Sequence, residues 1–218
     1  MAHSNRGILY NGRLLPSAGM VADGRTVPLR AGGVCFWQEP SPNIRARKNA
    51  IRAVLLHHTA GEGNGTAIFK TLQSRKLSVH FTIDREGVVT QHADLASVAY
   101  HAGPANSYTV GIEIASRGVA PSLPQAPRES YADRVHGVER LFLAFYKDQV
   151  TATRTLCRDL CDLLQLPFKF PTSEDGSVKR VLLTGSELST WRGMLGHMHV
   201  SQKKVDPSPH IYEELLSE

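Results

Sequence analysis

The feature that most constrains the fold is a short continuous apolar run over residues 51–57, which ends in His57. A run of this length, followed by the glycine-rich loop 61–65, is typical of a β-strand that is buried on both faces. We therefore expect a buried central strand with His57 at its end.

Strand and helix patterns alternate along the rest of the chain. Such alternation predicts a single α/β domain with a mixed central β-sheet flanked by helices. The segments behind this prediction are a helical repeat at Ile68, Phe69 and Leu72, a hairpin over 79–91 with its turn at 84–87, a strand over 110–115, an amphipathic helix over 149–166 ended by Pro167, and a last strand over 194–200.

Residues 1–45 differ in composition from the rest of the chain. Residues 1–45 are rich in glycine and proline and have no helical repeat, which predicts an irregular N-terminal arm. Residues 46–218 carry the strand and helix patterns and are expected to form the catalytic domain. Within that domain, prolines mark 116–130 as a surface loop, and the polar stretch 173–176 is expected to be a loop.

Charge and hydropathy exclude several classes of protein. The chain has 218 residues, 25 Lys and Arg against 20 Asp and Glu, and a net charge of +5. No basic run is interleaved with aromatic residues, so we expect no nucleic-acid partner. No apolar stretch approaches the ~20 residues of a membrane helix, and the N-terminus lacks the apolar region of a signal peptide. We expect a monomer that is synthesised in the cytoplasm.

Cysteines do not indicate a disulfide framework or a metal site. Cys157 and Cys161 are four residues apart within the predicted helix and so share one helix face. No further cysteine or histidine lies near them to complete a zinc site. We interpret both as reduced core residues.

The segment 197–206 holds side chains suited to a zinc hydrolase. His197 and Asp206 offer an imidazole and a carboxylate to a metal, and Lys204 offers a cation for charge that builds on a substrate oxygen. His57 supplies a second imidazole from far upstream. Two imidazoles and one carboxylate leave a fourth tetrahedral position open for water, which is the pattern of a catalytic zinc site.

Spacing leaves the ligand set partly open. His58 follows His57, and neighbours along a strand face opposite sides, so only one of the two reaches the metal. His199 is two residues from His197 and would share its face in a strand. His199 therefore competes with Asp206 for the third ligand position, and spacing alone does not decide between them.

Glu113 and Lys204 have both a functional and a structural interpretation. An acidic side chain inside the apolar strand 110–115 is costly to bury unless it has a partner or a task. Beside a metal, Glu113 could move a proton between water and a leaving amine, but it could also pair with an arginine at a strand edge. Lys204 could stabilise an oxyanion, or it could be a solvated surface lysine.

Six short motifs in order resemble the zinc-dependent N-acetylmuramoyl-L-alanine amidases, the family that includes phage amidases and animal peptidoglycan recognition proteins. They span about residues 50–210, which is most of the chain. The motifs are Val54-Leu55-Leu56-His57-His58-Thr59-Ala60, Ser78-Val79-His80-Phe81 with Asp84-Arg85-Glu86-Gly87, Tyr100-His101-Ala102-Gly103, Asn106, Val110-Gly111-Ile112-Glu113, and Gly196-His197 through Lys204-Val205-Asp206-Pro207.

This resemblance implies a zinc site formed by His57, His197 and Asp206, which leaves His199 outside the ligand set. It implies that Glu113 is the general base and that Lys204 stabilises the oxyanion. It also implies, more weakly, that His101 and Asn106 bind substrate.

Two departures make the chain more similar to the bacterial recycling type than to the phage type. Val79 stands where phage-type enzymes have a tyrosine, and the last ligand is aspartate rather than cysteine. The arm over 1–45 and the segment 168–193, with Trp191, have no counterpart in the resemblance.

The expected function is hydrolysis of the amide between N-acetylmuramic acid and L-alanine of the stem peptide. The substrate would be peptidoglycan or a soluble muropeptide. An endolysin of a phage or prophage would act on the wall after release or export, whereas a recycling amidase would act on anhydro-muropeptides in the cytoplasm. The alternatives are a non-catalytic peptidoglycan-binding module and a zinc peptidase for another muropeptide bond.

Overall fold

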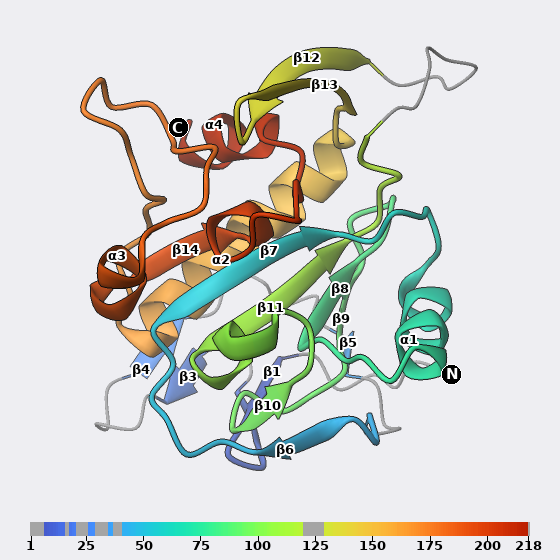
Figure 1. Cartoon of the computed structure of the whole chain (residues 1–218). Coiled ribbons are helices and arrows are strands. Elements are labelled where there is room, and N and C mark those ends of the chain that lie inside the picture. Colours follow the sequence, from blue (N-terminus) through green and yellow to red (C-terminus); the bar gives the residue numbers. More distant parts are fainter. Residues whose placement is uncertain are drawn as a thin grey trace.

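The computed structural model describes residues 7–15, 18–20, 26–28, 35–36, 41–119 and 129–217. Figure 1 shows a central twisted sheet with helices on both sides. The strands are β1 Ile8–Tyr10, β2 Arg13–Leu15, β3 Ala18–Met20, β4 Thr26–Pro28, β5 Cys35–Phe36, β6 Ile44–Ala46, β7 Ala53–His58, β8 Phe81–Ile83, β9 Val89–Gln91, β10 Ser97–Ala99, β11 Thr109–Ile114, β12 Ser130–Val135, β13 Val138–Leu143 and β14 Gly193–Gly196. The helices are α1 Gly65–Ser74, α2 Lys147–Leu164, α3 Gly185–Thr190 and α4 His210–Leu216, with short 3-10 turns η1 Gly103–Ser107 and η2 His197–His199.

The main sheet has the strand order β14-β7-β11-β8-β9-β5. Strands β14, β7, β11 and β8 are parallel to one another, while β9 is antiparallel to β8 and parallel to β5. The expected mixed sheet in an α/β domain is therefore confirmed. The expected hairpin over 79–91 is present as β8 and β9, and the helix expected over 149–166 is present as α2, which begins at Lys147 and ends at Leu164.

The run 51–57 forms β7, and both of its faces are covered as expected. Val54 and Leu56 point into the main core, which α2 closes on one side of the sheet. Ala53 and Leu55 point to the other side, where they pack against Ala102 and other residues near η1 and α3. Since side chains alternate along a strand, His57 continues the face of Ala53 and Leu55.

The long helix α2 packs its apolar stripe against the sheet. Leu156, Leu160 and Leu163 are fully or almost fully buried, and so are Cys157 and Cys161, which are both free thiols. The reduced core positions expected for these two cysteines are confirmed. Gln165 adopts a left-handed conformation at the C-terminal cap, directly before Leu166 and Pro167, which ends the helix where the sequence predicts.

The last strand differs from its prediction. The sequence predicts a strand through Val200, but β14 ends at Gly196 and His197–His199 turn into η2. A side chain at Gly196 would collide with the Tyr212 hydroxyl from α4. The close approach of α4 thus selects glycine where the strand ends, and the chain turns immediately after it.

The structure contains two hairpins in regions where the sequence predicts an irregular arm and a surface loop. Of the predicted surface loop 116–130, residues 120–128 lie outside the described residues, and Ser130 begins the hairpin β12–β13, which the sequence analysis does not predict. In the arm, the hairpin β1–β2 places Ile8 and Leu15 in the main core. The boundary at residue 46 stays a prediction.

None of the described helices has the length and hydropathy needed to span a membrane.

Candidate metal centre and active site

Three parallel strands bring the first half of the site together. His57 is directly opposite Glu113 in the register of β7 and β11, and Gly196 at the end of β14 is opposite Leu56. All three strands run in the same direction, so their carboxyl ends meet at one edge of the sheet. Side chains that follow these ends converge there, as in other open α/β sheets.

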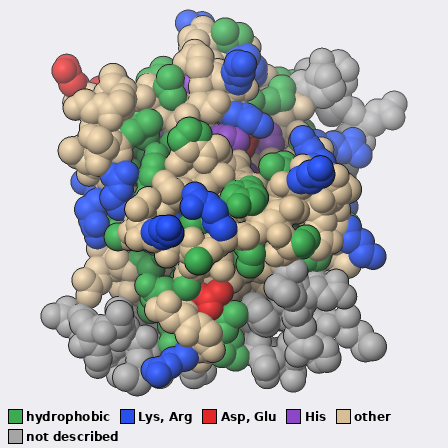
Figure 2. Space-filling model, turned by 60° about the horizontal axis from the view of Figure 1, so that its bottom comes forward, with side chains coloured by type: hydrophobic (Ala, Val, Ile, Leu, Met, Phe, Trp, Pro, Cys, Tyr) green, Lys and Arg blue, Asp and Glu red, His purple; other side chains and the backbone are tan. Residues whose placement is uncertain are grey.

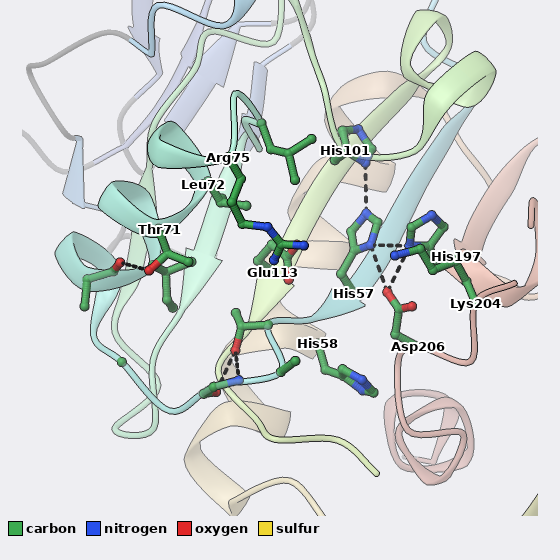
Figure 3. A pocket seen from close by; sticks show the side chains of 17 residues that line it. His57, His58, Thr71, Leu72, Arg75, His101, Glu113, His197, Lys204 and Asp206 are labelled. Carbon is green, nitrogen blue, oxygen red and sulfur yellow. Dashed lines mark hydrogen bonds and ion pairs between the residues drawn. The ribbon is translucent and has the colours of Figure 1, made fainter.

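His57, His197 and Asp206 form a compact buried cluster. Asp206 Oδ2 lies 3.0 Å from His57 Nδ1 and 3.0 Å from His197 Nδ1, and the two Nδ1 atoms are 3.0 Å apart. The three residues are only 2%, 7% and 8% exposed. Figure 3 shows the three polar groups turned toward one point.

The donor chemistry of this cluster fits a divalent metal such as zinc. In a tetrahedral site with bonds of about 2.0–2.1 Å, neighbouring ligand atoms are separated by about 3.3 Å, close to the spacing seen here. The two imidazole nitrogens and one carboxylate oxygen all present lone pairs to the same point. Such groups repel one another at this distance unless a cation or a proton lies among them. The structure thus offers His57, His197 and Asp206 as a possible metal-binding set.

A hydrogen-bond chain behind His57 supports this assignment of donors. His57 Nε2 lies 2.9 Å from His101 Nδ1. If Nδ1 of His57 faces a metal, Nε2 carries the hydrogen and donates to His101, which is the usual outer support of a metal-bound histidine. Burial lowers the pKa of His57 to about 4 and holds the pKa of His101 well below its ordinary value, so both rings are neutral near pH 7.

Glycine at position 111 makes room for this support. A Cβ on Gly111 would lie 2.8 Å from atoms of the His101 ring, closer than carbon atoms pack in proteins. Asn106 holds the same loop, because its Oδ1 accepts hydrogen bonds from the backbone N–H groups of His101 and Ala102 at 3.0 and 2.6 Å. His101 lines the pocket, whereas Asn106 is occupied with the loop. Their substrate-binding role stays a prediction.

Asp206 is held as a carboxylate. Burial by itself would raise the pKa of Asp206, but the two imidazoles of His197 and His57 beside it outweigh burial and hold the pKa well below the usual range. The backbone helps to fix the residue, since Met198 N–H donates to the Asp206 carbonyl at 3.1 Å. Asp206 is therefore available as an anionic ligand across the working pH range.

Glu113 differs from Asp206 in its environment. Burial and, to a smaller extent, the charge of Asp206 together raise the pKa of Glu113 to about 8, although the charges of Lys204 and Arg75 lower it. One of its carboxylate oxygens is buried without a hydrogen-bond partner. A partly buried carboxylate with a raised pKa, beside a possible metal site and open to a pocket, is suited to proton transfer.

These residues line one pocket with a volume of about 420 Å³. His57, His101, His197 and Asp206 line it, with Glu113 across the cavity and Lys204 next to His197 and Asp206 (Figure 3). In Figure 2, histidine side chains are visible in a recess of the surface that is bordered by Lys and Arg side chains. A basic rim favours an anionic substrate.

His199 lies outside the cluster. Its Nδ1 accepts a hydrogen bond from Gly196 N–H at 2.8 Å, its Nε2 lies 2.6 Å from the Lys179 carbonyl oxygen, and its ring stacks on Tyr212. The period of two that puts His199 on the face of His197 applies only in a strand, and these residues form the turn η2. The expected shared face is therefore wrong, and both nitrogens of His199 have other partners.

One pocket residue, Arg75, is missing from the sequence analysis. It follows Ile68 and Leu72 at helical spacing and reaches toward Glu113 from the end of α1 (Figure 3). That spacing was the available signal, because residues seven and three apart share a helix face. His136, in the turn between β12 and β13, gave no such signal, since no sequence pattern predicts this hairpin.

Comparisons with known proteins agree with this geometry. A family model described as N-acetylmuramoyl-L-alanine amidase matches residues 47–209. No curated protein sequence matches the chain.

Two solved structures share the fold, an endolysin N-acetylmuramoyl-L-alanine amidase LysCS and an amidase LysC, both from Clostridium intestinale URNW. Both are 14% identical, both comparisons cover 85% of this chain, and they cover 96% and 98% of the other chains with TM-scores of 0.51 and 0.50. A structure titled as an AmpD derivative is 16% identical, with a TM-score of 0.48 and coverage of 82% of this chain and 92% of that one.

The family match covers the region in which the six motifs occur. It confirms the family and the peptidoglycan amidase function that the motifs predict. The chain belongs to the N-acetylmuramoyl-L-alanine amidase family.

Proposed function

We propose that this chain is a zinc-dependent amidase that hydrolyses the amide between the lactyl group of N-acetylmuramic acid and L-alanine of the stem peptide. The observation that carries the proposal is the convergence of His57 Nδ1, His197 Nδ1 and Asp206 Oδ2 at 3.0 Å from one another, in the pocket that Glu113 also lines. These three residues would hold the metal. Bound zinc would supply a Lewis acid that polarises the amide carbonyl and makes water more acidic.

Glu113 acts as the proton carrier in this proposal. Its carboxylate takes a proton from the water that attacks the lactyl carbonyl carbon, and the C–N bond then breaks as Glu113 returns that proton to the departing nitrogen. The products are a lactyl carboxylate and a stem peptide with a free L-alanine amino group. A raised pKa suits both steps, because such a group gives up its proton as readily as it accepts it.

Lys204 stabilises the negative charge that builds on the carbonyl oxygen. Lys204 lines the same pocket as His57 and Glu113, which lie on two different strands. A fixed cation beside a developing oxyanion stabilises the transition state more than the ground state. His101 would keep the His57 ring in the orientation that presents Nδ1 to the metal.

Product analysis tests the reaction. The purified protein is incubated with zinc and a defined muropeptide, and the products are identified by mass spectrometry. We expect intact stem peptides with a free L-alanine amino terminus. Cleavage inside the peptide would instead indicate a peptidase, and binding of the muropeptide without any product would indicate a recognition module.

The biological setting is a second part of the proposal. Aspartate as the third ligand and valine at position 79 favour the recycling type, while an endolysin role would require action on intact walls. Rates on intact sacculi and on soluble anhydro-muropeptides separate the two. A strong preference for the soluble substrate supports recycling in the cytoplasm, and rapid solubilisation of sacculi supports a lysin that acts after release or export.

A further inference from the structure

The hairpin β12–β13 has a histidine where its turn would ordinarily carry asparagine. Its two turn residues, His136 and Gly137, have φ values of 53° and 78°. Two positive φ angles in a two-residue turn are typical of type I′, which favours Asn-Gly. A histidine in this conformation is uncommon, so its side chain is a candidate for a specific contact.

His136 contacts two other segments of the chain. Its backbone N–H donates to the Arg180 carbonyl at 2.9 Å, and its ring Nε2 lies 2.8 Å from the Lys204 carbonyl oxygen. A carbonyl oxygen only accepts, so Nε2 must carry the hydrogen. The turn of the hairpin is therefore hydrogen-bonded to the loop that carries Lys204.

Among the described residues, this is the one hydrogen bond that joins residues 201–205 to a part of the chain outside 197–206. The other hydrogen bonds of the loop are internal to its own stretch: Ser201 N–H donates to the His197 carbonyl and Lys204 N–H to the Ser201 carbonyl, both at 3.1 Å. Lys204 itself is exposed and has four rotatable bonds in its side chain. The position of its backbone thus decides where the ammonium group can lie.

The hairpin is anchored firmly enough to serve as a support. Val135 and Phe142 are fully buried in the main core. Arg180 ties the hairpin to its neighbours, because its guanidinium donates to Asp133 of β12 at 2.9 Å and to Glu213 of α4 at 2.7 Å. These contacts link β12, the segment around Arg180 and α4 on one side of the Lys204 loop.

We infer that His136 is a positioning residue that holds the loop 201–205 in place and thereby keeps Lys204 at the active site. The inference rests on the role proposed above for Lys204 as the oxyanion partner. The physical reason is that a cation stabilises a transition state only if it is already in place, and displacement by about 1 Å can cost roughly 10²-fold in rate.

His136→Asn separates the ring contact from the turn. Asparagine is the residue that a type I′ turn favours, so the hairpin should keep its stability, but the shorter side chain no longer reaches the Lys204 carbonyl. We expect kcat on a defined muropeptide to fall about 10-fold while KM changes less than about twofold. Zinc content and melting temperature should stay as in the unchanged protein. Amide hydrogen exchange should rise in residues 201–205 and stay unchanged in β7 and β11.

Two further variants complete the experiment. His136→Gln carries an N–H donor on a longer side chain and should restore part of kcat. Glu139→Ala, an exposed change on the same hairpin, is the matched control and should leave kcat and exchange unchanged.

A double-mutant cycle with Lys204→Ala tests whether His136 affects kcat through the Lys204 side chain. If His136 acts through the Lys204 ammonium, His136→Asn should cause little further loss in the Lys204→Ala background. An equal loss in both backgrounds, or unchanged exchange in residues 201–205, would overturn the inference. Full activity of Lys204→Ala alone would instead overturn the oxyanion role in the proposed function. In that case increased exchange in His136→Asn would still show that the ring holds the loop.

Discussion

The candidate active site has two halves that are built differently. The strand half consists of His57 and Glu113, which are opposite each other on β7 and β11 in the middle of the sheet. The loop half consists of His197, Lys204 and Asp206, which follow the edge strand β14 in a turn and a loop. The strand half inherits its geometry from backbone hydrogen bonds of the sheet. The loop half depends on side chains that reach it from other parts of the fold.

This difference has a consequence for mutation. A side chain of the strand half can be replaced with little effect on the positions of its neighbours, because the backbone hydrogen bonds between β7 and β11 remain. Residues of the loop half depend on neighbours that do not line the pocket, namely His199 beside Gly196 and, by our inference, His136 beside the Lys204 carbonyl. Substitutions at such supports should therefore affect the loop half and leave the strand half unchanged.

The largest expected effect follows from removal of a metal ligand. The losses of zinc and of rate should be equal whether the ligand belongs to the strand half or to the loop half. Asp206→Ala and His57→Ala should each lose bound zinc and at least about 10³-fold in rate, since a catalytic metal supplies several kcal/mol of transition-state stabilisation. Metal analysis and the amidase assay measure both. Asp175→Ala, a carboxylate in an exposed turn, is the control and should keep zinc and activity. Retention of zinc by Asp206→Ala would remove it from the ligand set.

The next effect isolates Glu113 in the strand half. Glu113→Ala and the isosteric Glu113→Gln should both keep zinc but lose about 10²-fold or more in rate, the usual size of a general acid–base contribution. If either variant has full activity, Glu113 is not the base.

The proposed role of Glu113 also predicts the direction in which the rate changes with pH. Glu113 works as a carboxylate, and its pKa is raised to about 8 by burial before any metal charge is considered. A bound dication favours the carboxylate and lowers this value. The rate should therefore fall as pH decreases through the Glu113 pKa, at or below about 8. This acidic limb should be absent in Glu113→Gln.

The smallest of these effects tests a support of the loop half. His199→Asn loses the contacts with Gly196 N–H and the Lys179 carbonyl and the stacking on Tyr212. We expect zinc affinity to fall about 10- to 100-fold, the usual cost of removing an outer partner of a metal site. Titration with a zinc-competing chelator measures it. His210→Ala, an exposed histidine on α4, is the control, and equal affinities of the two variants would show that His199 does not support the site.

The strand half is predictable from the sequence for a local reason. Side chains alternate between the two faces of any β-strand, so once the apolar run is taken as a strand, the separation of His57 from His58 follows directly. The apolar strand around Glu113 marks that residue in the same way. Pairing of β7 with β11, and the register that sets Glu113 beside His57, is not encoded in either segment. It is seen only in the folded sheet, where the two strands pair directly and share the core that α2 covers.

The loop half is less predictable because its geometry is non-local. The residues allow either His199 or Asp206 as the third ligand, and only the family resemblance favours Asp206. In the structure the strand ends at Gly196, where Tyr212 leaves no room for a side chain, and η2 turns His199 toward Lys179. His136 belongs to a hairpin that follows a proline-rich stretch, and nothing in its neighbourhood predicts a contact with residue 204.

The sequence by itself determined the α/β architecture, the candidate side chains and the family, because these depend on local periodicity and on short motifs in order. Tertiary structure decided which side chains meet. It brought His57, His197 and Asp206 within 3.0 Å of one another, turned His199 away, and set His136 against the loop of Lys204. The physical reason is that a strand carries its own geometry in its backbone, whereas a loop takes its geometry from the surfaces that pack around it.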